Sequence, residues 1–75
     1  MKQSEEVKIL AYMIRQVRHS KRHGMHWVSF YHSKVSKKQR RAYQYLVEHA
    51  EEIKQAPTTR DVAITESSVT IYYSR

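Results

Sequence analysis

The chain has 75 residues, so we expect a single small domain over residues 1–75. Its 14 Lys and Arg residues and 7 Asp and Glu residues give it a formal charge of +7. The absence of Cys excludes disulfides and thiolate metal sites. No apolar run approaches the ~18 residues that span a bilayer, and no apolar core of a signal peptide follows Met1. We therefore expect a cytoplasmic protein with no cofactor and no membrane contact.

The first predicted element is a helix over residues 4–23. Ser4 is expected as its N-cap, with Glu5 and Glu6 in the first turn, where carboxylates suit the helix dipole. Apolar residues at helical spacing predict its buried stripe, which Ile9 and Met13 widen: Val7, Leu10, Ala11, Ile14 and Val17. Gly24 can adopt the left-handed conformation that closes a helix.

Residues 25–32 are rich in aromatic and β-branched side chains that alternate with a period of two. Val28 and Phe30 fall on one face, and Trp27 and Tyr31 fall on the other. This alternation favours a short strand, although eight residues are also compatible with a short helix.

A second helix is predicted over residues 37–55. Ser36 and Gln39 fit a capping box, in which the side chain of each residue accepts a hydrogen bond from the backbone N–H of the other. Pro57 lies beyond the expected C-terminal end of this helix. The apolar face comprises Ala42, Tyr43, Leu46, Val47, Ala50 and Ile53. Basic residues crowd its first half and Glu residues its second half, which opposes the helix dipole at a cost of ~0.3–1 kcal/mol per charge.

Residues 61–73 predict a β-hairpin with its turn at Ser67-Ser68. Its inward residues are expected to be Val62, Ile64, Val69, Ile71 and Tyr73. The fold class is then α+β, in the order helix, strand or short helix, helix and hairpin. A winged-helix-like module, with the helix over 37–55 in the major groove, is the first hypothesis for it. Either a monomer or a homodimer is compatible with so thin a core.

The stretch 15–41 contains nine Lys and Arg and four His but none of the seven carboxylates. Such a concentration of like charge is costly by itself and points to an anionic partner. A helix N-terminus within the block adds free backbone N–H groups that suit phosphate. Aromatic residues among the cations can stack on bases. The candidate nucleic-acid-binding residues are Arg15, Arg18, Arg22, Trp27, Tyr31, Lys34, Lys37, Lys38, Arg40, Arg41 and Tyr45.

Two alternatives for these residues are structural. A lone Trp in a small domain is often part of the core, and a run of Lys and Arg is often a solvated helix face. The spacing of His19 and His23 can chelate a metal, with His26 and His32 further along, but neighbouring cations oppose a divalent ion, so no metal is expected.

The composition favours a small, non-catalytic nucleic-acid-binding protein of a regulatory kind, with DNA preferred over RNA as the partner. One alternative is a phage- or plasmid-type protein that binds an acidic host protein and inhibits or recruits it. Another is a metal-independent ribonuclease that uses His26, His32 and Tyr31 with a neighbouring cation. Steep salt dependence would distinguish nucleic acid from a protein partner.

Overall fold

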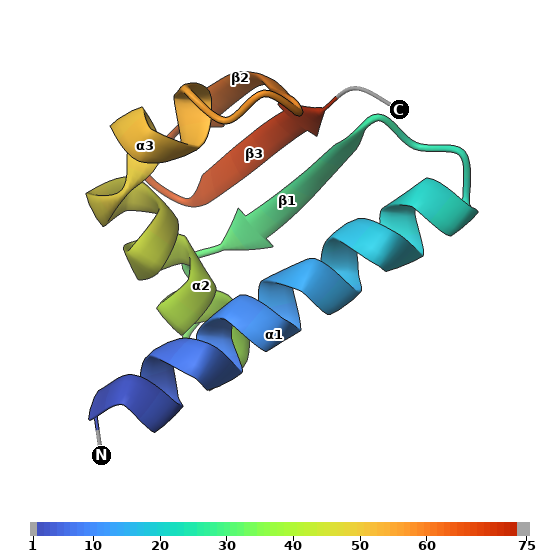
Figure 1. Cartoon of the computed structure of the whole chain (residues 1–75). Coiled ribbons are helices and arrows are strands. Elements are labelled where there is room, and N and C mark those ends of the chain that lie inside the picture. The colour runs from blue at the N-terminus through green and yellow to red at the C-terminus, as the bar shows by residue number, and fades with distance from the viewer. Residues whose placement is uncertain (1, 74–75) are drawn as a thin grey trace.

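The computed structural model describes residues 2–73, and the side chains of residues 5–73, as helices packed on one antiparallel sheet (Figure 1). The elements in chain order are α1 (Lys2–Arg22), β1 (Trp27–Tyr31), α2 (Lys37–Glu48), α3 (Ala50–Lys54), β2 (Thr59–Ile64) and β3 (Ser68–Tyr73). The strand order is β1-β3-β2, so the first strand lies beside the last one. The predicted α+β class is therefore confirmed. No helix in the described part of the chain is long and apolar enough to cross a membrane.

Helix α1 confirms the first predicted helix, with a different start. It begins at Lys2, so Ser4 lies within the first turn and is not the N-cap. At its C-terminus Gly24 has a φ of 73°, and the N–H of Met25 donates to the Ser20 carbonyl at 3.0 Å. This is the hydrogen-bond pattern of a Schellman motif, which glycine allows because it has no Cβ.

The buried face of α1 differs from the predicted stripe. Val17 and Met13 pack against the core as predicted, but Val7 is 61% exposed and Ile14 is 52% exposed. Tyr12, which was not part of the predicted stripe, also packs against the core. The Tyr12 ring meets Phe30 edge to face, with their centroids 6.2 Å apart. The prediction counted aliphatic residues, and the helix is turned instead so that this tyrosine is covered.

The predicted helix over 37–55 is broken at His49 into α2 and α3. His49 has φ −111° and ψ 20°, outside the helical range, and its Nδ1 lies 2.9 Å from the Tyr45 carbonyl oxygen. Neither Gly nor Pro marks this break in the sequence. As a result, Glu51 and Glu52 lie in the first turn of α3, where the dipole favours them, and only Glu48 remains unfavourably placed at the end of α2.

The capping box is half confirmed. The Ser36 hydroxyl accepts a hydrogen bond from the Gln39 backbone N–H at 3.3 Å. The Gln39 side chain does not return to Ser36. Its Oε1 accepts from the Tyr31 backbone N–H at 2.9 Å, and its Nε2 donates to the Tyr12 hydroxyl. The Ser36 N–H bonds instead to the Ser33 hydroxyl at 3.3 Å.

The C-terminal hairpin is confirmed, and β2 begins at Thr59, two residues before the predicted start. Its turn occupies Thr65 to Ser67, where the Thr65 hydroxyl accepts from the Ser67 and Ser68 N–H groups at 3.3 and 3.0 Å. This side-chain bonding explains how the turn forms without the Gly or Asn that tight hairpins prefer. Ile64 was predicted inward but is 45% exposed at the end of β2.

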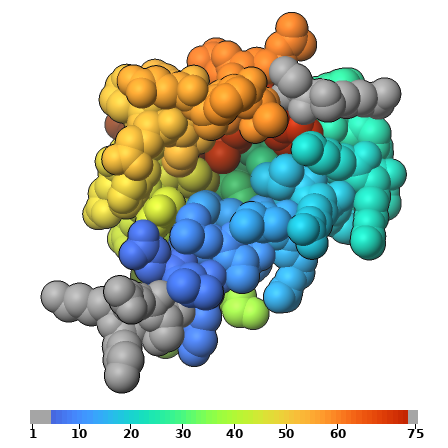
Figure 2. Space-filling view, in the orientation of Figure 1, coloured from blue at the N-terminus to red at the C-terminus, as the bar shows by residue number. Residues whose placement is uncertain are grey.

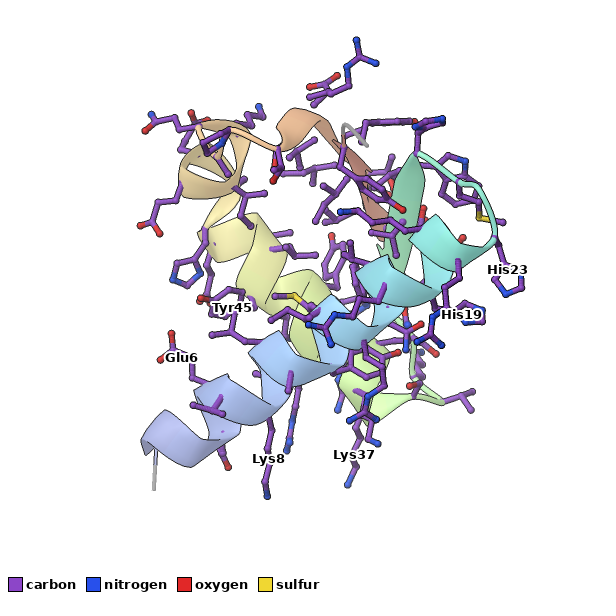
Figure 3. All side chains as sticks on the ribbon, turned by 45° about the vertical axis from the view of Figure 1, so that its right-hand side comes forward. Glu6, Lys8, His19, His23, Lys37 and Tyr45 are labelled. Carbon is purple, nitrogen blue, oxygen red and sulfur yellow. The ribbon has the colours of Figure 1, made fainter. Side chains whose placement is uncertain are left out.

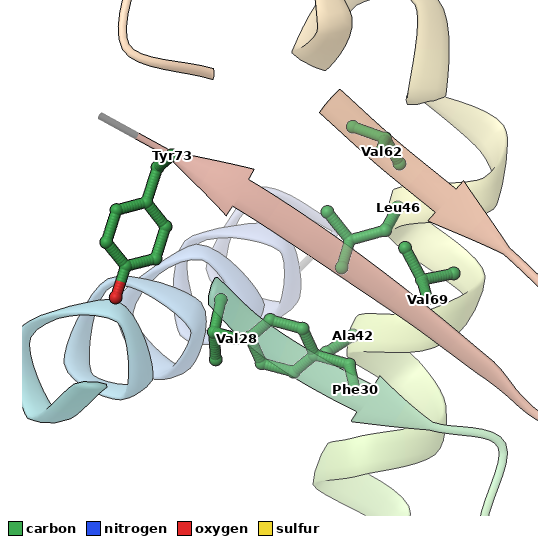
Figure 4. Packing of buried hydrophobic residues seen from close by; sticks show 7 residues of the cluster. All are labelled: Val28, Phe30, Ala42, Leu46, Val62, Val69 and Tyr73. Carbon is green, nitrogen blue, oxygen red and sulfur yellow. The ribbon is translucent and has the colours of Figure 1, made fainter. Parts of the chain in front are cut away.

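The core lies between the inner face of the sheet and the helices (Figure 4). It is formed by the buried residues Val28, Phe30, Ala42, Leu46, Val62, Val69 and Tyr73. Residues 27–31 form a strand and not the short helix that was the alternative for 25–32, so a strand lies between α1 and α2. The helices that do follow one another are α2 and α3, and α3 has only five residues, two of them glutamates.

Candidate functional site

Three cations of the basic block line a groove between α1 and α2. The groove has a volume of about 260 Å³, and its uncharged lining residues are Ile9, Ala11 and Tyr12. Four cations surround it, two from each helix: Lys8, Arg15, Lys38 and Arg41. No carboxylate lines it among the residues that the structure describes. We call this feature the cationic groove.

Helical spacing and one side-chain clamp explain how these four cations meet. Lys8 and Arg15 are seven residues apart on α1, which places them on the same face two turns apart, and Lys38 and Arg41 are likewise neighbours on α2. Gln39 joins the two helices through its bond to Tyr12. Figure 3 shows Lys8 and Lys37 extending from the two helices on the same side of the molecule.

A second hollow continues the positive surface along α1. Its volume is about 450 Å³, and its lining residues are Ala11, Ile14, Arg15, Arg18, His19 and Arg22. Arg15 borders both this hollow and the cationic groove. The predicted residues Arg15, Arg18 and Arg22 therefore form one surface that continues into the groove at the α2 end.

The remaining predicted cations lie close in sequence to the cationic groove but do not line it. Lys34 and Lys37 are exposed, and Arg40 is half-buried. The first turn of α2 contains Lys37 and no acidic residue, so the reversal of charge at this helix end stands as predicted. Lys37 and Lys34 can extend the positive surface, whereas Arg40 has less freedom to reach a ligand.

Tyr45, one of the candidate nucleic-acid-binding residues, does not line the cationic groove, although it lies on α2 with Lys38 and Arg41. It lines a different groove of about 420 Å³ between α1 and the helices α2 and α3, visible as a hollow in Figure 2. Its hydroxyl donates to the Glu6 carboxylate at 3.4 Å, and its ring stacks on His49 with centroids 4.1 Å apart. Burial raises the pKa of the Tyr45 hydroxyl, and the negative charge of Glu6 raises it further.

Lys8 is the groove residue that sequence reasoning missed. It precedes the stretch without carboxylates and follows Glu5 and Glu6, so counting charge by segment assigned it to an acidic flank. The available signal was its spacing of seven residues from Arg15, which places both side chains on one helical face. Its pairing with α2 depends on how the two helices pack.

The predicted stacking residues lie on the outer face of the sheet. Trp27 is 44% exposed and Tyr31 is 54% exposed, so the alternative that Trp27 belongs to the core is wrong. Tyr72, which is 41% exposed, stands directly opposite Trp27 in the register of β1 and β3. Sequence reasoning missed Tyr72 because β3 was expected to contribute only its inward residues.

The histidines do not converge on one site. His19 and His23 lie together, with ring centroids 4.5 Å apart, but the described residues contain no group of three or more potential metal ligands. His26 and His32 flank the two ends of β1, so six residues of extended chain place them on the order of 20 Å apart. They are thus too distant to serve as the acid and base of one RNA cleavage step.

Comparison with known proteins found no family model, no curated protein and no solved structure that matches this chain.

Proposed function

We propose that this protein is a small, non-catalytic nucleic-acid-binding protein of a regulatory kind, which holds the phosphate backbone in the cationic groove. The observation that supports this proposal is that Lys8 and Arg15 line one groove with Lys38 and Arg41, and that no described residue contributes a carboxylate to it. Four cations gathered in this way repel one another unless an anion lies between them. Phosphate groups spaced along a polymer also suit the further cations Arg18 and Arg22 on α1.

Cations near a helix end can also be purely structural, and the two helices differ in this respect. His19, Lys21 and Arg22 lie in the last turn of α1, where the dipole stabilises positive charge by itself. Lys37 and Lys38 lie at the opposite kind of end, the start of α2, where the dipole disfavours them. The α2 cations are therefore the better evidence for an anionic ligand, and Lys38 belongs to the groove.

The test is fluorescence anisotropy with labelled duplex DNA, single-stranded DNA, single-stranded RNA and double-stranded RNA, each at ~50–300 mM salt. Each phosphate contact contributes roughly 0.9 to the slope of log affinity against log salt on duplex DNA, and roughly 0.7 on a single strand. We expect the double variant Lys38→Gln and Arg41→Gln to weaken binding. The slope should become less steep by the amount that one to two phosphate contacts contribute.

The matched control removes the same charge elsewhere. Lys54 and Arg60 are exposed and lie on α3 and β2, outside the cationic groove. The variant Lys54→Gln and Arg60→Gln should therefore retain most of the affinity and the slope. Equal losses of affinity in the two variants would show that nucleic acid is attracted by the overall positive charge and not bound in the cationic groove. Weak binding to all four polymers would overturn the proposal and would favour an acidic protein as the partner.

A further inference from the structure

The outer face of the sheet carries exposed aromatic side chains, which the described helices leave uncovered. The helices pack against the inner face, where Val28, Phe30 and Val69 are buried. The opposite face presents Trp27 and Tyr31 from β1 and Tyr72 from β3, each exposed by more than two fifths. Figure 1 shows the helices α1 and α2 gathered on one side of the strands.

Stability does not account for all three aromatics. A cross-strand aromatic pair such as Trp27 and Tyr72 contributes ~0.2–1 kcal/mol to a sheet. Tyr31, however, stands opposite Ser68 and is the most exposed of the three. Exposed aromatic groups of this size on one face are typical of a surface that meets a partner.

The charge around β1 identifies the kind of partner. This strand lies within the stretch 15–41, which has no carboxylate, and it is preceded by Arg22 and followed by Lys34. On the outer face, Asp61 stands opposite Tyr72 at the far side of β3. A polyanion that follows β1 therefore meets aromatic rings on a strand that contributes no carboxylate, and it avoids Asp61 at the far side of β3.

We propose that the polymer is single-stranded nucleic acid, with bases stacked on Trp27 and Tyr31, an inference that rests on the proposed function. These two residues lie four apart on an extended strand, or ~13 Å. Bases stacked in a helix rise only ~3.4 Å each, so two rings at that distance take two bases only from an unstacked strand. A duplex keeps its bases paired and inside, out of reach of this face.

Hydroxyl groups occupy the space between the two aromatics. Ser29 and Thr70 stand opposite each other, with their hydroxyl oxygens 2.8 Å apart in a hydrogen bond. They offer polar groups to the edge or sugar of an intervening nucleotide without adding charge. Stacking on Trp and Tyr tolerates any base, so the face selects an unpaired strand and not a sequence.

The test uses Trp27, the single Trp of the chain, as its reporter. The probes are oligothymidylate, oligouridylate and a DNA duplex of equal length, at one salt concentration. We expect both single strands to quench the Trp27 emission and to bind more tightly than the duplex. The variant Tyr31→Leu should weaken single-strand binding by about fivefold to a hundredfold, as expected for the loss of one stacked base.

Controls separate this inference from the proposed function. The variant Val47→Ser alters a side chain that is 40% exposed on α2, away from the sheet face, and should retain single-strand binding. A different result is that the duplex binds as tightly as the single strands without quenching Trp27, and that this binding is lost in the Lys38→Gln and Arg41→Gln variant. That result would refute the stacking site on the sheet and support the cationic groove. Binding to no polymer would overturn both. Dimerisation that is abolished by Tyr31→Leu would assign the face to a second copy and overturn the inference.

Discussion

Gln39 connects three elements beside the cationic groove, and replacing it tests whether that connection holds them together. Its side-chain oxygen accepts from the Tyr31 N–H of β1, and its side-chain nitrogen donates to the Tyr12 hydroxyl of α1. Gln39→Met preserves the length of the side chain and removes both bonds. A hydrogen bond contributes ~0.5–1.5 kcal/mol net, and water can replace part of the exposed bond to Tyr31, so we expect a loss of ~1–2 kcal/mol.

The assay is urea and thermal unfolding followed by far-ultraviolet circular dichroism, arranged as a double-mutant cycle with Tyr12→Phe. Phe at this position retains the ring that packs on Phe30 and lacks the hydroxyl. We expect Tm to fall by ~4–8 °C per kcal/mol in Gln39→Met, and a coupling energy of at least ~0.5 kcal/mol between the two positions. A coupling energy within ~0.3 kcal/mol of zero would refute the clamp and leave Gln39 as an ordinary residue of the first turn of α2.

Two further predictions concern the core and the Tyr45 hydroxyl. Leu46→Ala should lower the free energy of unfolding by ~2–5 kcal/mol, because Leu46 is only 1% exposed and the change leaves a cavity. Val47→Ala, at a position that is 40% exposed, should cost far less in the same urea titration, and equal losses would contradict the described packing. The raised pKa of Tyr45 means that ionisation of its hydroxyl is disfavoured in the folded state. The contribution of this hydroxyl to folding stability is therefore complete below pH 10.0 and is lost as the pH rises through the folded-state pKa. Stability measured from pH 9 to 11 should therefore fall more steeply in the wild type than in Tyr45→Phe, and parallel curves would contradict this.

Much of the fold could be read from the sequence, because the deciding interactions are local. The apolar spacing in α1, the Ser36 cap of α2 and Gly24 after α1 all act within a few residues. The alternation in residues 25–32 likewise predicted which side chains of β1 face the core. The predictions were wrong where contacts between elements decide the end of a helix or its buried face. His49 breaks a helix whose own sequence would continue it, and Tyr12 turns α1 away from its aliphatic stripe.

The candidate site was predicted less completely, because the net charge of a segment does not show which of its side chains lie together in the folded protein. The sequence identified Arg15, Lys38 and Arg41, but only the packing of α1 on α2 brings them to one groove with Lys8. Tyr45 shares a helix with Lys38 and Arg41, yet its ring stacks on His49 and lines another groove.

By itself, the sequence determined the α+β class and the position of the basic block, and it favoured a strand over a short helix for residues 25–32. Helical periodicity, caps and strand alternation depend on neighbours in the chain, so they are visible without a structure. The tertiary structure alone decided that Trp27 is exposed beside Tyr72 and that four cations share a groove. Those facts depend on which elements lie side by side, and that choice is made by burying Phe30, Leu46 and Val69 together between the sheet and the helices.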